Sequence, residues 1–270
     1  MRRAGTFLLA LMLAAAWTAA AASARAPRWA PESRAAVHPG VMTFTQDAQC
    51  TANFVFYDRR DVYIGQAAHC SGTGSSDETD GCKAKSLPLN TRVTVDGARH
   101  PGRLAYNSWR SMQHYHERDA NTCADNDLAL IRLDRRDARS VNPTIPVWGG
   151  PTGLTTSTSE GQDVFSYGNS SIRQGITTLS PKRGTSLGQA DGGWTHTVYT
   201  VTPGIPGDSG SGFIDDRGRA FGVLSTIDFL PLPGSNGVGD LSRELRYLAR
   251  HTKLRVSLAR GTRRFDSSRG

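Results

Sequence analysis

Short apolar runs separated by turn residues constrain the fold of this 270-residue chain more than any other feature. One set of runs lies within residues 41–132 and a second within residues 162–224, and both are rich in valine, isoleucine and aromatic residues. Glycine, serine and aspartate separate the runs, which is typical of strands joined by turns. Residues 143–160, rich in proline, glycine, threonine and serine, divide the two sets.

Only the last part of the second half has a helical pattern. Leu241, Leu245 and Leu248 fall on one face of a helix, and Asp240 before them is a favourable N-cap residue. Two sets of short strands followed by one helix predict an all-β protein. We expect two packed antiparallel β-barrels, linked near residues 143–160, with a C-terminal helix.

The N-terminus has the pattern of an export signal. Arg2 and Arg3 precede an apolar run at residues 7–16, and small residues follow with cleavage motifs ending at Ala24 and Ala26. The run is shorter than the roughly 20 residues that a membrane span needs. We therefore expect a signal peptide at 1–26, a leader or short propeptide at 27–40, and a secreted, monomeric protein with no membrane contact after signal removal.

The net charge of +8 is concentrated at the C-terminus. From Arg243 onward there are nine basic residues against two acids, so the rest of the mature chain is close to neutral. We interpret residues 252–270 as a solvated basic tail. Phe265 is the only aromatic residue interleaved with these charges, so no nucleic-acid partner is expected.

Four cysteines, at positions 50, 70, 82 and 123, remain in the exported chain. An even number in an oxidising compartment favours two disulfides, and the residues alone leave all three connectivities open. The chain has no Cys-x-x-Cys pair and no matching histidine pair, so we expect neither a metal site nor a cofactor.

Three segments contain residues suited to amide hydrolysis. Residues 66–70 (Gln-Ala-Ala-His-Cys) follow a predicted strand, residues 126–131 place Asp127 before an apolar strand, and residues 207–212 (Gly-Asp-Ser-Gly-Ser-Gly) surround Ser209 with glycines. An imidazole activates a serine hydroxyl by taking its proton, and a buried carboxylate fixes the imidazole tautomer. Glycines let backbone N–H groups converge on a developing oxyanion.

These motifs, and their order of His, Asp and then Ser, resemble those of the chymotrypsin/trypsin family over residues 41–251. The resemblance implies a secreted serine endopeptidase acting on proteins or peptides through an acyl-enzyme. It makes Ser209 the nucleophile, His69 the general base and Asp127 the residue that orients it. The backbone N–H groups of Gly207 and Ser209 would form the oxyanion hole.

The resemblance also implies the disulfide pairing and the specificity pocket. Cys70 follows the histidine and Cys50 precedes it by one hairpin, as in the family, which leaves Cys82 to pair with Cys123. The substrate-binding positions are Pro203, Ser225, Thr226 and Gly237. Because Pro203 stands where trypsin-like members have an acid, we expect a preference for small or medium apolar residues, with Asp228 as the residue most able to reverse it.

One departure and three alternatives qualify this interpretation. The family's usual Ile-Val-Gly-Gly start is absent, so we expect Asp208 to pair with an internal basic group. An α/β-hydrolase is disfavoured because its order is Ser, acid, His and its motif is Gly-x-Ser-x-Gly. A catalytically inactive binding module of the same fold and an enzyme acting on esters only remain as alternatives.

Overall fold

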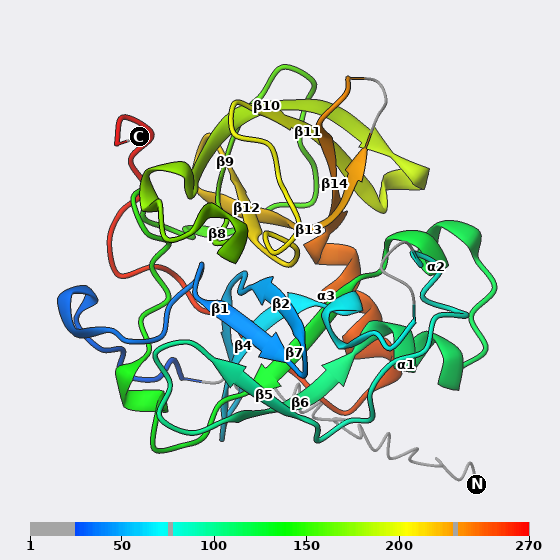
Figure 1. Ribbon diagram of the computed structural model, residues 1–270, viewed down its shortest axis with the longest axis horizontal. Coiled ribbons are helices and arrows are strands. Elements are labelled where there is room, and N and C mark those ends of the chain that lie inside the picture. The colour runs from blue at the N-terminus through cyan, green and yellow to red at the C-terminus, as the bar shows by residue number, and fades with distance from the viewer. Residues whose placement is uncertain (1–24, 75–77, 229–231, 270) are drawn as a thin grey trace, which may run out of the picture.

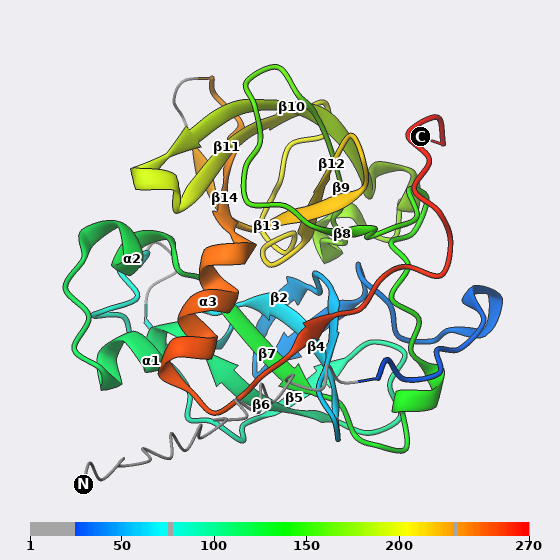
Figure 2. The same cartoon turned by 180° about the vertical axis from the view of Figure 1, so that it is seen from behind.

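The computed structural model describes residues 25–74, 78–228 and 232–269, with only the backbone of Asp228 (Figures 1 and 2). Most of the predicted signal peptide lies outside these residues. The strands are β1 Met42–Thr45, β2 Ala48–Thr51, β3 Val55–Tyr57, β4 Val62–Ala67, β5 Arg92–Val95, β6 Gly102–Asn107, β7 Leu128–Arg132, β8 Gly153–Leu154, β9 Asp163–Tyr167, β10 Pro181–Ala190, β11 Thr195–Thr200, β12 Gly212–Asp215, β13 Arg219–Asp228, β14 Ser235–Asp240 and β15 Ser257–Leu258. The helices are α1 Ser108–His114, α2 Ala120–Asp125 and α3 Leu241–His251.

The N-terminal sheet has the strand order β15-β3-β4-β7-β6-β5-β1-β2, and all of its pairings are antiparallel. Strands β2 and β3 are two ends of one stretch: β2 pairs with β1 and β3 pairs with β4. The stretch therefore brings the two edges of the sheet together and curls it around its apolar core (Figure 1). Val55, Ile64, Val93 and Ile131 are fully buried there.

The C-terminal sheet closes into a barrel. Its order is β12-β9-β10-β11-β14-β13, and an additional pairing of β12 with β13 completes the circle. The short β8 adds to β13 in parallel. Val164, Val198, Phe213 and Phe221 are fully buried inside it. The predicted all-β class is thus confirmed.

Helix α3 begins where the sequence predicted it. The Asp240 carboxylate accepts a hydrogen bond from the Arg243 N–H at 2.8 Å, which caps the first turn. Leu241 and Leu248 are buried, and the helix runs from the upper barrel down over the lower one (Figure 2). Among the described residues no helix is long and apolar enough to cross a membrane.

Two segments expected to be loose are packed instead. In the leader, the N–H of Ala30 donates to Val141 O at 2.9 Å and Val37 is fully buried in the N-terminal core. Residues 257–266, here called the C-terminal strap, pair with β3 and place the Phe265 ring 5.2 Å from that of Phe165. Charge counting missed this because backbone bonds, a few apolar side chains and one specific ion pair, Arg263 with Glu32 at 3.0 Å, hold these segments.

Candidate active site

A cavity of about 650 Å³ lies where the two halves meet. His69 and Asp127 line it from the N-terminal half, and Gly207, Ser209 and Ser225 line it from the C-terminal half. The three predicted segments are far apart in the sequence, and residues from all three line this one cavity.

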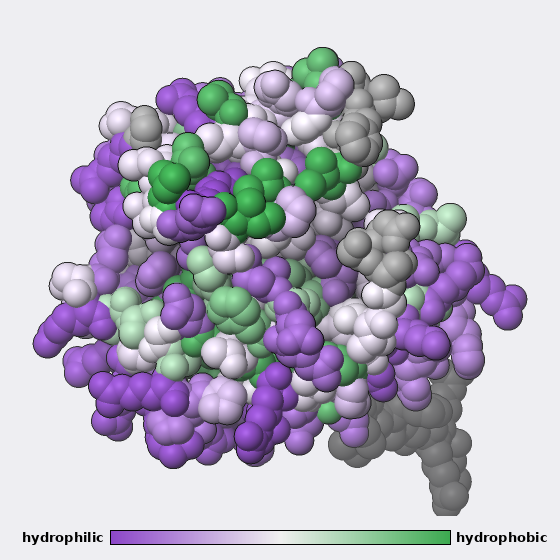
Figure 3. Space-filling model, in the orientation of Figure 1, coloured by the Kyte–Doolittle hydropathy of each residue, from purple (hydrophilic) through white to green (hydrophobic). Residues whose placement is uncertain are grey.

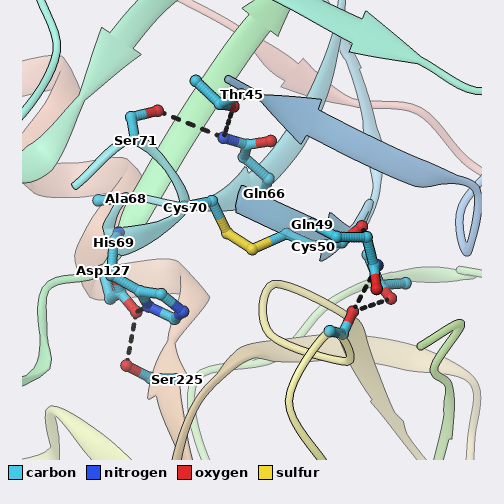
Figure 4. The surroundings of a disulfide bond; sticks show 12 residues. Thr45, Gln49, Cys50, Gln66, Ala68, His69, Cys70, Ser71, Asp127 and Ser225 are labelled. Carbon is cyan, nitrogen blue, oxygen red and sulfur yellow. Dashed lines mark hydrogen bonds and ion pairs between the residues drawn. A yellow bond between two sulfur atoms is a disulfide. The ribbon is translucent and has the colours of Figure 1, made fainter. Parts of the chain in front are cut away.

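His69 lies in a 3-10 turn, His69–Ser71, two residues after β4. The Cys50–Cys70 disulfide ties this turn to the end of β2, with the two Cα atoms 6.2 Å apart (Figure 4). The imidazole side chain is 27% exposed, so one of its edges faces the cavity. The predicted pairing of Cys50 with Cys70 is confirmed, as is that of Cys82 with Cys123.

Asp127 directly precedes β7, and the antiparallel register pairs Ala67 of β4 with Leu128 of β7. This register brings Asp127 beside His69. One carboxylate oxygen of Asp127 accepts from the His69 backbone N–H at 2.9 Å, and the other lies 2.7 Å from Nδ1 of the ring (Figure 4). Because an ionised carboxylate only accepts hydrogen bonds, Nδ1 carries the proton and Nε2 is left as a base.

The electrostatics favour this pair. Burial alone lowers the pKa of the His69 imidazole, but the charge and hydrogen bond of Asp127 raise it, and the resulting pKa lies above the ordinary 6.5. Ser225 adds a hydrogen bond at 2.6 Å from its hydroxyl to the same Asp127 oxygen that faces the ring. This bond crosses from one half of the molecule to the other.

Glu244 of α3 supports Asp127 from behind. One of its carboxyl oxygens accepts from the Asp127 backbone N–H at 3.0 Å, and the side chain is fully buried. Burial raises the pKa of Glu244 well above its usual value. The hydrogen bond from the Asp127 N–H lowers this pKa, and the negative charges of Asp127, Asp240 and Asp125 raise it further. This shift is in the direction of the protonated form, in which Glu244 holds the backbone without adding a negative charge beside Asp127.

Ser209 lies in a tight turn between Gly207 and Gly210, whose φ angles are +94° and +88°. The Ser209 carbonyl accepts from the Thr51 N–H at 2.9 Å, which ties the turn to the N-terminal half. A Cβ at Gly210 would lie 2.7 Å from Ala67 N and from Thr51 O. Only glycine therefore fits at this position, both by backbone angle and by space.

The peptide groups on both sides of Gly207 are held by side chains. The Ser170 hydroxyl donates to Pro206 O at 2.5 Å, and the Gly207 carbonyl accepts from Gln49 Nε2 at 3.0 Å and from the Thr51 hydroxyl at 2.8 Å. In a trans peptide the C=O and N–H point in opposite directions. Holding the Pro206 carbonyl therefore fixes the direction of the Gly207 N–H.

Asp208 is fully buried and is bound by two internal cations, as the sequence predicted. Arg173 Nη2 lies 2.7 Å from one carboxylate oxygen and Lys182 Nζ lies 3.1 Å from the same oxygen. Burial lowers the pKa of Lys182; Asp208 counteracts this shift and Arg173 adds to it. A Cβ at Gly168 would approach Asp208 to 2.4 Å, so a glycine is needed to admit the carboxylate. We call Asp208, Arg173 and Lys182 the Asp208 ion cluster.

The predicted specificity residues divide into two groups. Ser225 and Thr226 line the cavity together with Ile227, whereas Pro203 and Gly237 are not among its described lining residues. Gly237 pairs with Thr226 across β13 and β14. The carbonyl of Pro203 accepts from Lys182 Nζ at 3.0 Å. The Asp228 side chain, named as a threat to the apolar preference, lies outside the described residues.

Several residues near the cavity were missed by sequence reasoning. They share contacts with the segments of His69, Asp127 or Ser209, and they are Gln49, Trp109, Ser170, Arg173, Lys182 and Glu244. Only Glu244 left a sequence signal, because it is a charged residue on the face that Leu241 and Leu248 define. The others come from β2, α1, β10 and the segment 170–173, and their contacts depend on the tertiary fold.

Comparison with known proteins agrees with this architecture. The sequence model described as a trypsin-like peptidase domain matches residues 50–223, which is more than half of the chain. The chain belongs to the trypsin-like peptidase family. No curated protein sequence matches it.

Solved structures extend the similarity of this trypsin-like peptidase to the whole fold. Protease A of Thermobifida fusca is 18% identical with a TM-score of 0.54, covering 84% of this chain and 100% of that one. A glutamic acid-specific serine protease, described as using a novel histidine triad in substrate binding, is 15% identical with a TM-score of 0.52, covering 83% and 100%. The Nocardiopsis protease NAPase is 16% identical with a TM-score of 0.50, covering 82% and 98%. These likenesses establish the fold, and together with the family they support a serine protease.

Proposed function

We propose that the protein is a secreted serine endopeptidase with Ser209 as nucleophile, His69 as general base and Asp127 as the residue that orients the base. The observation that carries the proposal is the 2.7 Å contact between His69 Nδ1 and Asp127, in a cavity that Ser209 also lines. This contact leaves Nε2 of His69 as the base, and no metal or cofactor is invoked.

In the proposed reaction the Ser209 hydroxyl oxygen attacks the carbonyl carbon of the scissile peptide while His69 Nε2 takes its proton. The N–H groups of Gly207 and Ser209 stabilise the oxyanion. The Ser170 bond to Pro206 O holds the peptide that carries the first, and the bond from Ser211 N–H to Asp208 O at 3.0 Å holds the peptide that carries the second. The imidazolium then protonates the leaving amine. Water attacks the acyl-enzyme by the same route and regenerates Ser209.

The primary specificity is proposed to be for small or medium apolar side chains. Two features support it: the branched Thr226 and Ile227 line the cavity, and no acid stands at Pro203. The Asp208 ion cluster behind Pro203 adds two cations against one carboxylate. Lysine and arginine side chains would meet an excess of positive charge there, so substrates carrying them at the cleaved residue are expected to be rejected.

Secretion and maturation also remain proposals. Two disulfides are consistent with an oxidising, extracellular compartment. We expect export to remove the chain up to Ala24 or Ala26, and a second cut after Arg34 to leave Ala35 at the N-terminus. Arg34 is exposed at the end of a short 3-10 turn, where a protease has access. N-terminal sequencing of the secreted protein tests both cuts; a fully active form beginning at Arg25 or Pro27 shows that the second is unnecessary.

Labelling with a fluorophosphonate probe tests the catalytic assignment. We expect the wild-type protein to be labelled and Ser209→Ala to be unlabelled, while the neighbouring Ser211→Ala, also within the glycine-rich segment, keeps its label. A wild-type protein that folds and stays unlabelled would favour the inactive binding module. Parallel assays with matched peptide and ester substrates separate an endopeptidase from an enzyme that acts on esters only.

A set of chromogenic peptides ending in Ala, Val, Leu, Phe, Arg or Glu tests the specificity. We expect cleavage after Ala, Val or Leu to be fastest. Preferred cleavage after Arg that disappears in Asp228→Ala would overturn the apolar pocket while leaving the catalytic assignment intact.

A further inference from the structure

Three arginines stand directly opposite one another on neighbouring strands of the N-terminal sheet. Arg92 of β5 pairs with Arg103 of β6, and Arg103 in turn pairs with Arg132 of β7. Directly paired residues project from the same face of a sheet, and like charges at such positions destabilise it. A row of three arginines is therefore unfavourable for the stability of the sheet. Unfavourable arrangements of this kind are expected at functional sites.

The nearby carboxylates do not neutralise this row. Asp61 is bound by Arg135 at 3.0 Å and Asp134 by Arg136 at 2.8 Å. Within the described part of the chain, Arg92, Arg103 and Arg132 make no ion pair; Arg103 donates only to the Asn90 carbonyl, at 3.1 Å. His100, on the same rim, is bound to Asp137 at 3.0 Å.

These side chains surround a hollow of about 680 Å³. Its lining holds five arginines against the two carboxylates of Asp61 and Asp134, an excess of three positive charges before His100 is counted. We call this hollow the arginine pocket. Its lining residues include members of β5, β6 and β7, and β5 and β6 lie in the lower part of the molecule (Figure 1), where hydrophilic side chains gather along the lower edge (Figure 3).

The arginine pocket is separate from the catalytic cavity. Arg132 is the last residue of β7, and Asp127 immediately precedes its first. Five residues of extended strand span roughly 16 Å. A ligand in the arginine pocket therefore leaves the cavity with His69 and Ser209 open to substrate.

We propose that the arginine pocket binds a linear polymer carrying phosphate or sulfate groups. Guanidinium groups are planar forks that bind oxyanions by paired, charge-assisted hydrogen bonds. A phosphate or sulfate group carried as an ester offers three terminal acceptor oxygens, and successive units of polyphosphate offer two each at close spacing. Both present more acceptors to three unpaired arginines than the two oxygens of a single carboxylate. The ion-paired Arg135 and Arg136 extend the positive rim beyond a single anionic group, which favours a polymer. The enzyme would thus be held on an anionic matrix while its cleft remains free.

Binding of short inorganic polyphosphate, a heparin oligosaccharide and poly-glutamate to the full-length secreted protein tests the proposal. The variant R92Q/R103Q/R132Q is expected to bind polyphosphate or heparin at least about tenfold more weakly at ~0.1 M salt. The slope of log K against log salt is expected to fall by about 2 to 3, from the loss of three contacts. Fluorophosphonate labelling is expected to be unchanged, because the pocket lies away from the cavity.

The matched control is R250Q/R255Q/R260Q, which removes the same charge from exposed positions of the C-terminal region. We expect it to weaken binding by less than about threefold. If the glutamine variant of the pocket misfolds, R92K/R103K/R132K retains the charge and is expected to keep the salt slope while losing affinity, because lysine lacks the fork. A preference for polyphosphate or for heparin identifies the source of the anion. Equal binding of poly-glutamate, absence of binding by both oxyanion polymers, or a larger loss in the C-terminal variant would overturn the proposal.

Discussion

The two halves of the molecule hold their shares of the candidate site by different means. In the N-terminal half, disulfides are adjacent to both relevant segments: Cys70 follows His69 directly, and Cys123 lies four residues before Asp127. The C-terminal half contains no cysteine. There the turn of Ser209 is anchored by the neighbouring Asp208, a buried carboxylate bound to two cations.

One candidate site therefore rests on covalent and electrostatic anchors together. A disulfide acts mainly by restricting the unfolded chain, and it is sensitive to reductants. A buried ion cluster acts through charge, and removing one member leaves the others without compensation. The two halves should therefore fail under different perturbations.

Replacing Asp208 breaks the electrostatic anchor. Asp208→Asn leaves Arg173 and Lys182 buried without a counter-charge, so we expect a loss of about 3–5 kcal/mol in the free energy of unfolding and loss of activity. Urea denaturation measures the first and fluorophosphonate labelling the second. The control is Arg183→Gln, which breaks an exposed pair with Asp163 and should cost under about 1 kcal/mol. Similar losses in the two variants would show that the cluster is no anchor.

Removing the disulfides breaks the covalent anchor. The bridges close loops of 20 and 41 residues, so chain entropy predicts losses of about 3 kcal/mol for Cys50/Cys70→Ser and about 4 kcal/mol for Cys82/Cys123→Ser. The loss of activity should be larger in Cys50/Cys70→Ser than in Cys82/Cys123→Ser, because Cys70 is adjacent to His69. Urea denaturation and peptide hydrolysis on both double variants measure this reversal, and equal activity losses would contradict it.

Glu244 positions Asp127 by a hydrogen bond, whereas the disulfides hold the N-terminal half by covalent bonds. Glu244→Leu leaves the buried Asp127 N–H without an acceptor and is expected to cost about 1–3 kcal/mol. Glu244→Gln keeps an acceptor and, like the protonated acid, carries no charge. We therefore expect it to leave the acidic limb of the kcat/KM profile in place. A shift of that limb to lower pH in Glu244→Gln would mean that Glu244 is ionised in the enzyme.

The pH dependence separates activity from stability at His69. Because the folded pKa of His69 lies above 6.5, kcat/KM should rise with pH through that raised pKa as the base becomes neutral. The stabilising contribution of the charged pair runs the other way: it is fully present below pH 6.5 and is lost as pH rises through the folded pKa. Urea denaturation of wild type and His69→Gln from about pH 5 to about pH 9 measures it. A difference that grows with pH would contradict this.

Ser225 tests the hydrogen bond that joins the two halves. Ser225→Ala removes the bond to Asp127 while the Nδ1 contact and the backbone contact of that carboxylate remain. We expect the smallest effect of the series, a fall in kcat/KM of about tenfold or less, equivalent to at most about 1.4 kcal/mol. Peptide hydrolysis measures this fall. The control is Ser71→Ala, because Ser71 is also buried but its hydroxyl accepts from Gln66 and not from a group of the candidate site. A loss as large as that of Ser209→Ala would assign Ser225 a direct part in the chemistry.

Sequence patterns predicted what depends on local spacing. The strand sets, the capped helix after Asp240 and the motif residues are all encoded by near neighbours. The Cys50–Cys70 pair was predicted only from the family resemblance. The partners of Asp208 were predicted only as an internal basic group. Arg173 comes from a loop and Lys182 from β10, and nothing in their neighbourhoods marks them as buried.

The arginine pocket shows the same limit for charge. Counting along the sequence assigned the positive charge to the C-terminus, because the basic residues cluster there. Arg92, Arg103 and Arg132 are spread over forty-one positions and become neighbours only through the register of β5, β6 and β7. Sheet register depends on long-range pairing, which composition does not reveal.

The C-terminal strap affects how the two halves of the molecule unfold. It pairs with β3 in the lower half, bonds through Gly261 N–H to Pro151 O at 2.9 Å in the link, and packs Phe265 on Phe165 in the upper half. The two halves therefore cannot separate until the strap has detached, which favours a single cooperative unfolding step. In the proposed role of a secreted endopeptidase, the chain would be surrounded by copies of itself, and a half-open chain is what such copies would digest. By suppressing that species, the strap would then limit self-digestion.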